Sequence, residues 1–299
     1  MTETRYHRII TTFQRHLERQ RKHANTIRSY TNDAVQFFRW IGTTLGEDFN
    51  LAEVTRSDLL DYRAFLLTRN ASSASVNRRI TALRQFFDFC VGEKLCAMNP
   101  VSDITGVPNE AHLPPALSRK DALQLIRSSE QAGRPLETCI ILLLLHAGLR
   151  SSEICNLSIG DLYLTPREGR LFVRGQRGKT MRFVYLTTRT QGAVRLYCKR
   201  RGISILARRR RVEPLLTHAD GSGITQQAVD HIVKRVGKAA GLPGVTPTIL
   251  RNTCAVNLLL AGETPEAVGR VLGLSSLRNL VRFASALKEE SPGEHAAHR

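Results

Sequence analysis

Arginine and lysine are the residues of this sequence whose number and chemistry are most informative, because both bind anions. Lysine and arginine total 44 against 26 aspartate and glutamate, which gives a formal net charge of +18 and a sequence pI near 10.4. The guanidinium of arginine is planar and donates two parallel hydrogen bonds to a phosphate group, whereas lysine offers only a point charge. This excess of charge indicates a polyanionic partner, and nucleic acid is the leading candidate.

Two alternatives to a nucleic-acid partner stay open. The protein could be basic by lineage, or it could bind an acidic membrane surface. The membrane interpretation is weak because the longest apolar run, Cys139 to Leu145, is far shorter than the roughly 20 residues that a membrane span needs. The N-terminal residues carry no apolar signal core, so we expect a cytoplasmic protein.

The six cysteines are scattered along the chain without a CxxC pair. This pattern favours reduced, mostly packed thiols over a disulfide framework or a zinc site. The sequence therefore predicts no metal and no cofactor.

At 299 residues the chain is long enough for two domains, each with its own core. Apolar residues recur at helical spacing through the first hundred residues, and arginines fall outside these stripes. Thr55 and Asp58 form a capping-box pattern that predicts the start of a third helix. We expect a compact four-helix unit that buries Phe86, Phe87 and Phe89, because a DNA duplex exposes few base faces on which these rings could stack.

Residues 97–118 interrupt the helical pattern with four prolines, Gly106 and few large apolar residues, which is typical of an interdomain connector. Beyond it we expect a mostly helical domain with one β-hairpin, whose charged, glycine-rich loop begins at Gly175. Its predicted elements are helices over 120–129 and 140–145, a helix that begins near Ser151, and strands over 170–174 and 182–186. Four consecutive arginines, 208–211, fit a solvated turn as well as a DNA contact.

Four ordered segments of the second half carry a recognisable pattern: Leu145–Ile154, Gly175–Leu186, Thr246–Thr253 and Leu272–Ser285. In order and spacing they resemble the motif boxes of the tyrosine recombinases, also called the phage integrase family. The segments Val76–Ile80 and Leu83–Arg84 are similar to the core-binding domain of that family. The resemblance covers nearly the whole chain. It implies a mainly α fold with a small β-hairpin or sheet, built from an N-terminal four-helix, SAM-like core-binding domain and a C-terminal integrase-type catalytic domain.

These motifs give the domain boundaries that we expect. They are a core-binding domain over residues 1–100, a linker over 101–117, a catalytic-fold domain over 118–287 and a C-terminal tail over 288–299. The composition of the tail fits a disordered segment, while the family resemblance also allows it to pack on a neighbouring protomer.

In the family a tyrosine attacks the scissile phosphate, two arginines bind the non-bridging oxygens, and lysine and histidine side chains assist proton transfer. Arg150 and Arg251 match the two arginines, so the resemblance implies a retained pair of phosphate-binding residues. It also implies DNA contacts from Arg78, Arg79, Arg84, Arg177 and Lys179.

Four positions depart from the family pattern. The hairpin lysine falls on Gln176, although the neighbouring loop cations could substitute for it if the loop were shifted. The first histidine falls on Thr248, the second histidine or tryptophan on Leu274, and the nucleophile on Phe283. Phenylalanine has no nucleophilic atom, leucine forms no hydrogen bond through its side chain, and threonine does not titrate near neutral pH.

Nearby residues offer little replacement for the missing groups. The last tyrosine is Tyr197, and no histidine lies between His231 and His295. Ser276 and Ser285 are close to the Phe283 motif, but a serine needs a general base that the local sequence lacks. Each lost acid or base typically costs about 10²- to 10⁴-fold in rate.

The sequence therefore predicts a protein that binds duplex DNA like a tyrosine recombinase and has lost strand cleavage. We expect it to act in site-specific recombination or integration of a mobile element, with itself or an active recombinase in a synaptic complex. Three alternatives stay open: an active recombinase with a non-standard nucleophile, a transcriptional or architectural DNA-binding protein, and a decaying gene without a selected role.

Overall fold

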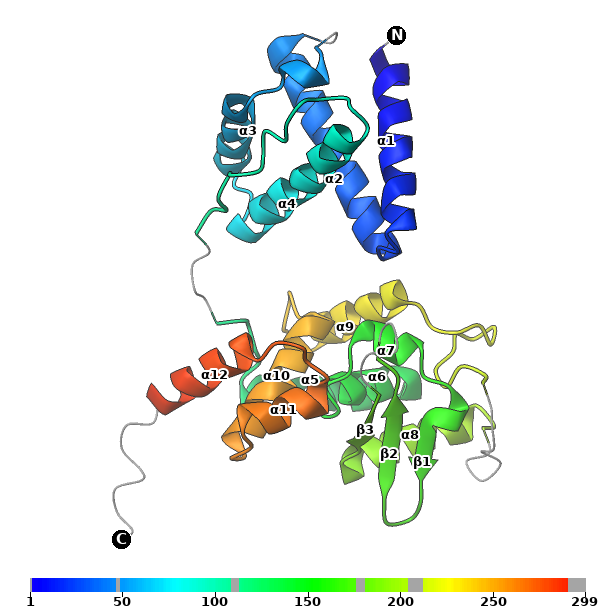
Figure 1. Cartoon of the computed structure of the whole chain (residues 1–299). Coiled ribbons are helices and arrows are strands. Elements are labelled where there is room, and N and C mark those ends of the chain that lie inside the picture. The colour runs from blue at the N-terminus through cyan, green and yellow to red at the C-terminus, as the bar shows by residue number, and fades with distance from the viewer. Residues whose placement is uncertain (1, 47–48, 109–112, 176–180, 204–211, 290–299) are drawn as a thin grey trace. The chain divides into compact units, whose positions relative to one another are not determined.

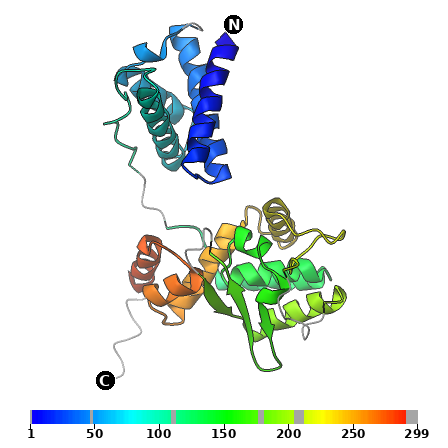
Figure 2. The ribbon, with the colours of Figure 1, turned by 45° about the vertical axis from the view of Figure 1, so that its right-hand side comes forward.

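A computed structural model describes residues 2–46, 49–108, 113–175, 181–203 and 212–289 of the chain. The chain divides into two compact units, Met1–Ala111 and His112–Arg299 (Figures 1 and 2). Gln176, Arg177 and Lys179, the arginine run 208–211 and residues 290–299 lie outside the described residues. None of the described helices is long and apolar enough to cross a membrane.

The first unit contains four α-helices and a short 3-10 helix in its described part. They are α1 (Thr2–Arg19), α2 (Ala24–Leu45), η1 (Leu51–Glu53), α3 (Arg56–Thr68) and α4 (Ser73–Gly92). The capping box predicted for α3 is confirmed, since the Thr55 side chain accepts the backbone N–H of Asp58 and the Asp58 carboxylate accepts that of Thr55. Phe86, Phe87 and Phe89 are buried, which confirms their predicted place in the core.

The chain that follows α4 packs back onto the first unit. Val101 and Ile104 are buried in its core, although they belong to the segment predicted as a linker. Arg84 on α4 donates its Nη2 to the carbonyl of Ile104 at 2.8 Å, and the Asn77 side chain exchanges two hydrogen bonds with the backbone of Val107. The first part of this segment therefore belongs to the folded N-terminal unit.

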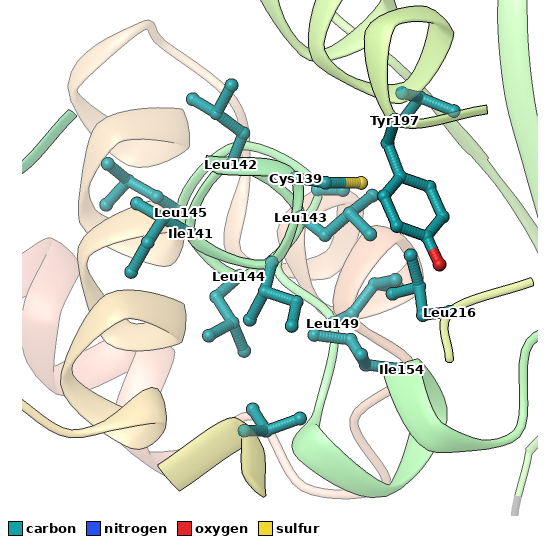
Figure 3. Close-up of a cluster of buried hydrophobic side chains, with 14 of the residues drawn as sticks. Cys139, Ile141, Leu142, Leu143, Leu144, Leu145, Leu149, Ile154, Tyr197 and Leu216 are labelled. Carbon is teal, nitrogen blue, oxygen red and sulfur yellow. The ribbon is translucent and has the colours of Figure 1, made fainter. Parts of the chain in front are cut away.

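The second unit combines helices with a three-stranded sheet. Its helices are α5 (Arg119–Gln131), α6 (Pro135–Leu145), α7 (Ser151–Cys155), η2 (Ile159–Asp161), α8 (Thr188–Arg200), α9 (Gln226–Ala239), α10 (Pro247–Leu260), α11 (Pro265–Leu272) and α12 (Arg278–Glu289). Helix α6 lies at the centre, and every residue from Cys139 to Leu145 is buried (Figure 3). A helix that is apolar on all sides is stable in water only when other elements surround it. Helix α6 is therefore a buried core helix.

The sheet is antiparallel, with its strands in the order β1 (Leu162–Leu164), β2 (Gly169–Val173) and β3 (Arg182–Tyr185). Strands β2 and β3 confirm the predicted hairpin, whereas β1 was not predicted. Leu171 and Val184 are paired in register and face the core, because alternate residues of a strand point to opposite faces. The fold is thus mainly α with a small sheet, as the sequence predicted.

The last three helices form a small core of their own, in which Cys254, Val268, Leu272 and Leu280 are buried. Gly148, at the turn before α7, lies against this core with a φ of +60°. A Cβ atom at this position would lie 2.2 Å from the Cδ2 of Leu272. Glycine is therefore required at residue 148 both by its backbone conformation and by close packing.

Candidate phosphate-binding site

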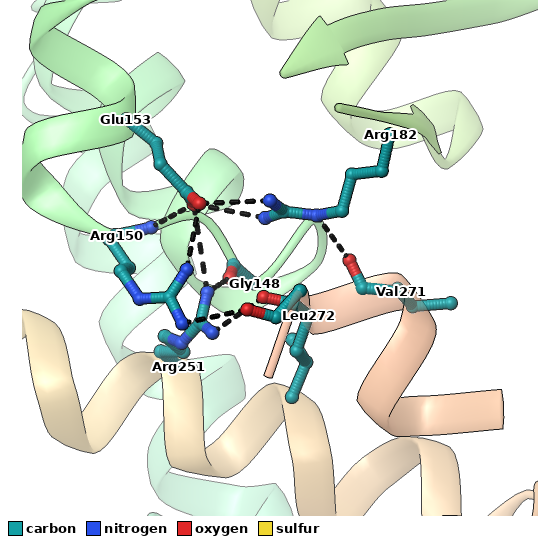
Figure 4. Close-up of polar contacts among 8 residues, drawn as sticks. Gly148, Arg150, Glu153, Arg182, Arg251, Val271 and Leu272 are labelled. Atoms are coloured by element: carbon teal, nitrogen blue, oxygen red, sulfur yellow. Dashed lines mark hydrogen bonds and ion pairs between the residues drawn. The ribbon is translucent and has the colours of Figure 1, made fainter. Parts of the chain in front are cut away.

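Arg150 occupies the N-terminus of α7, directly after the Gly148 turn. Its backbone N–H and its Nη1 donate to the two carboxylate oxygens of Glu153, at 2.8 and 2.9 Å, so Glu153 closes the first turn of the helix. Its Nη2 donates to the carbonyl of Gly273 at 2.9 Å (Figure 4). The Arg150 side chain is 39% exposed, so its guanidinium can be reached from solvent.

Arg251 reaches the same place from α10, although it is 101 positions further along the chain. Its Nη1 donates to the carbonyl of Gly148 and lies 3.7 Å from the Glu153 carboxylate, and its Nη2 donates to the carbonyl of Leu272 at 2.7 Å. The side chain is only 11% exposed. The structure therefore brings together the two arginines that the sequence matched to the family.

A third arginine completes the cluster. Arg182, the first residue of β3, donates Nη1 and Nη2 to the two oxygens of Glu153 at 2.8 and 2.9 Å, and its Nε to the carbonyl of Val271 at 2.7 Å. One carboxylate therefore serves three guanidinium groups from α7, β3 and α10 (Figure 4). Below, "arginine cluster" means Arg150, Arg182, Arg251 and Glu153.

The charges of the cluster act on one another. Burial raises the pKa of Glu153, but hydrogen bonds from Arg182 and from the backbone of Arg150 outweigh it and hold the pKa below its usual range. Burial, followed by the charge of Arg150, lowers the pKa of Arg251 to about 10. Three guanidinium groups face a single carboxylate, so the cluster keeps a net positive charge. Such a site suits a phosphate oxygen.

Of the positions that depart from the family pattern, Thr248 and Phe283 lie on helices, and Leu274 lies between α11 and α12. Thr248 is exposed in the first turn of α10, and Leu274 is partly buried against the core of the last three helices. Phe283 is buried on α12. Leu274 packs against apolar side chains and Phe283 is withdrawn from solvent, as expected for residues that keep the scaffold but carry no reactive group. Gln176 falls in the hairpin loop outside the described part of the chain.

The arginines predicted to contact DNA from the first unit have partners inside that unit. Arg78 donates to both oxygens of Asp33, and the Nε of Arg79 lies 3.9 Å from the same carboxylate. Asp33 is buried, and this burial raises its pKa despite the two arginines. Arg84 binds the returning backbone. These side chains therefore stabilise the unit. Of the two arginines beside Asp33, Arg78 is more exposed than Arg79.

Glu153 and Arg182 were not among the residues singled out from the sequence. Glu153 carried a signal, because an acidic residue three positions after a helix N-cap is the second half of a capping box. Arg182 carried none, since its contacts to Glu153 and Val271 join segments 29 and 89 positions apart.

Comparison with known protein families agrees with this architecture. Residues 116–290 match the model of the phage integrase family, and residues 10–94 match the phage integrase N-terminal SAM-like domain. The chain belongs to the phage integrase family. Both parts of the predicted fold, the SAM-like domain and the integrase catalytic domain, are thereby confirmed.

Several relatives in this family match most of the chain. The tyrosine recombinase XerC of Thermodesulfovibrio yellowstonii is 29% identical over 286 residues, which cover 93% of this chain and 90% of the relative. XerA of Thermococcus kodakarensis is 31% identical over 275 residues, which cover 90% and 87%. The crystal structure of the XerH site-specific recombinase bound to palindromic difH substrate, a post-cleavage complex, matches with a TM-score of 0.72 at 21% identity, covering 88% of this chain and 78% of that one. This last similarity concerns the fold.

Proposed function

We propose that this protein is a DNA-binding member of the phage integrase family that occupies recombination sites of a mobile element without cleaving them. The observation that carries the proposal is the pairing of an assembled arginine cluster with a buried Phe283 on α12. The cluster has the donors and the charge to bind a phosphate, and phenylalanine offers no atom to attack it. Phosphate contacts and counterion release supply most DNA affinity, and neither requires a nucleophile.

The positions of the tyrosines in the second unit argue against a substitute nucleophile. Tyr197 is buried, and its hydroxyl accepts the backbone N–H of Thr217 at 3.0 Å. Tyr163 and Tyr185 lie on the face of the sheet opposite to the one from which Arg182 reaches the arginine cluster. Ser276 and Ser285 are exposed, but a serine nucleophile needs a general base. The Nδ1 atom of His146 contacts the hydroxyls of Thr187 and Thr190 instead, at 3.2 and 3.3 Å.

We assign duplex DNA as the ligand and recombination as the setting by analogy with the relatives, which are named as tyrosine recombinases. The core-binding role then falls to residues 1–100 and the phosphate-binding role to residues 118–287, in the cytoplasm, where the DNA is. The protein would act as copies of itself or beside an active recombinase. A mixed assembly of this kind would hold a recombination site while leaving some of its strands uncut.

A gel-shift titration on duplexes taken from the DNA that flanks the gene tests the proposal, with each sample run again after denaturation in SDS. We expect a shift in the native gel that disappears in SDS. A band that survives SDS would be a covalent adduct and would establish an active recombinase with another nucleophile. A shift on promoter duplexes alone would instead favour a transcriptional role.

A further inference from the structure

The face of the sheet that points away from the core carries four aromatic residues and two arginines. We call it the outer sheet face and define it by six residues, one or more from each strand or its immediate end: Tyr163, Arg170, Phe172, Arg174, Phe183 and Tyr185. In Figure 1 the three strands are drawn in front of α8, and among the described residues no helix lies across this face. Phe183 is 55% exposed and Tyr185 is 66% exposed.

The side chains of this face are arranged in two cross-strand rows. In one row, Arg170 is paired in register with Tyr163 on one side and Tyr185 on the other. Its guanidinium lies over the rings of Tyr163 and Phe183, 4.5 and 5.3 Å from their centres. In the other row, the rings of Phe172 and Phe183 are 5.2 Å apart. The outer sheet face is thus ordered before any partner binds.

Sheet stability alone does not account for this surface. Aromatic residues are favoured in strands, and a cross-strand pair such as Phe172 and Phe183 stabilises a sheet. However, antiparallel sheets with one solvated face normally carry polar residues there. Tyr185 and the neighbouring Met181, which is 67% exposed, have most of their surface in solvent. Several exposed aromatic side chains gathered on one face are typical of interaction sites.

We propose that the outer sheet face docks an acidic protein segment that also carries apolar side chains. Tyrosine, phenylalanine, methionine and arginine are the residues enriched at the centres of protein interfaces. Arg174 is more than half exposed and binds the buried Asp161 through only one of its nitrogens at 2.6 Å, and the Nε of Arg170 lies 3.8 Å from the Glu168 carboxylate. Carboxylates of a partner would complement these two cations while its apolar groups cover the rings.

Two other occupants fit the geometry less well. A single-stranded nucleic acid would need free ring faces on which to stack its bases. The guanidinium of Arg170 already covers the rings of Tyr163 and Phe183, and the rings of Phe172 and Phe183 are tilted by 51° instead of forming one platform. A second copy of this chain has a net charge of +18, so its surface offers fewer carboxylates to Arg170 and Arg174 than an acidic segment does. The inference is independent of whether the protein cleaves DNA.

The probe that tests this inference is a fluorescein-labelled peptide of about 12 residues in which glutamate alternates with leucine and phenylalanine, long enough to span a face three strands wide. Its fluorescence anisotropy is titrated with the full chain, next to a peptide that carries glutamine in place of glutamate and a labelled oligothymidine. The test variant is the double substitution Phe183→Thr and Tyr185→Thr, since threonine keeps the preference for strand. Leu196→Gln, at a half-exposed position on α8, is the matched control.

We expect the glutamate peptide to bind at least tenfold more tightly than the glutamine peptide, and the double variant to lose at least tenfold of that affinity while Leu196→Gln loses none. Tyr185→Thr alone gives the same readout if the double variant does not fold. Equal binding by the variant and the wild type would overturn the proposal, because the peptide would then bind elsewhere on a basic protein. Competition by oligothymidine that depends on Tyr185, or self-association that the double variant abolishes, would replace the partner with a nucleic acid or a second copy.

Discussion

Arg182 and Glu153 form an ion pair with two hydrogen bonds, in which both side chains are almost completely removed from solvent. The distances are 2.8 and 2.9 Å, and the side chains are 8% and 2% exposed. Because Glu153 also binds Arg150 and lies near Arg251, it is a shared counter-charge that joins α7, β3 and α10. The cluster is therefore a structural element as well as a candidate ligand site.

The first prediction concerns the loss of this counter-charge. Glu153→Gln should lower the free energy of unfolding by about 3–5 kcal/mol, because three guanidinium groups then lose their shared carboxylate in a buried site. Urea denaturation followed by circular dichroism measures the change. Glu130→Gln is the matched control, since Glu130 forms a similar two-bond pair with Arg189 on the surface and should cost no more than about 1 kcal/mol. Similar losses in both variants would contradict the role given to Glu153.

The second prediction is the pH dependence of the same pair. The pKa of Glu153 is lower in the folded protein than its ordinary value of 4.5, so this group stabilises the fold above that pH, and the contribution is lost as the pH falls below it. The difference in stability between the wild type and Glu153→Gln should therefore shrink between about pH 5 and pH 3. Asp33, whose pKa is raised, is present in both proteins, so its opposite effect cancels in the difference. A difference that stayed constant over this range would exclude the linkage.

The third prediction tests the phosphate contact. Arg150→Ala should weaken DNA binding by about 10-fold to 100-fold, the value of one charge-assisted hydrogen bond, and should reduce the slope of log affinity against log salt by about one. Arg189→Ala removes an exposed arginine of the same unit that is paired with Glu130 and serves as the control. Filter binding at several salt concentrations separates the two. Equal effects from the two variants would show that only total charge matters.

The fourth prediction concerns Phe283. Phe283→Tyr should not restore efficient cleavage, because the positions of Gln176, Thr248 and Leu274 still lack proton-transfer groups. The measurement is the covalent adduct formed on a nicked duplex that traps it. A variant that also carries Gln176→Lys, Thr248→His and Leu274→His should form more adduct than the single variant. Robust cleavage by Phe283→Tyr alone would mean that the supporting groups lie elsewhere.

The fifth prediction is the cost of a methyl group at the turn before α7. Gly148→Ala should lower the free energy of unfolding by about 2–5 kcal/mol, because a positive φ strains alanine and the new Cβ overlaps Leu272. Gly133→Ala is a matched control, since Gly133 has a φ of +64° but nothing within 4 Å of its Cβ position. It should cost about 1–2 kcal/mol from the backbone alone. Thermal unfolding of the two variants compares these costs.

Local patterns in the sequence predicted local structure well. The Thr55 and Asp58 capping box, the buried run from Cys139 to Leu145 and the β2–β3 hairpin are each specified by residues close together in the chain. Strand β1 was missed because its three residues are too few to show an alternating pattern. Val101 and Ile104 were missed because two apolar residues in a segment rich in proline carry no periodic signal.

The candidate site was predictable only where a family motif marked it. Arg150 and Arg251 came from the resemblance, and the structure places them around one carboxylate. Neither the contacts of Arg182 nor the pairing of Arg78 with Asp33 could be inferred, because periodicity and spacing say nothing about partners 29 or 45 positions away. The exposed aromatic face was hidden for a similar reason: its rows appear only once the register of three strands is known.

The arginine cluster has one carboxylate for three guanidinium groups. This ratio limits the repulsion between the cations and still leaves the cluster with a net positive charge. With no acid, the three cations would repel one another across a buried space and the helices would not close around them. A second acid would halve the net charge of the cluster, from +2 to +1, and weaken its attraction for a phosphate. Glu153 supplies the anion that holds the three arginines together, so a phosphate that bound here would enter a site that is already folded and still positively charged.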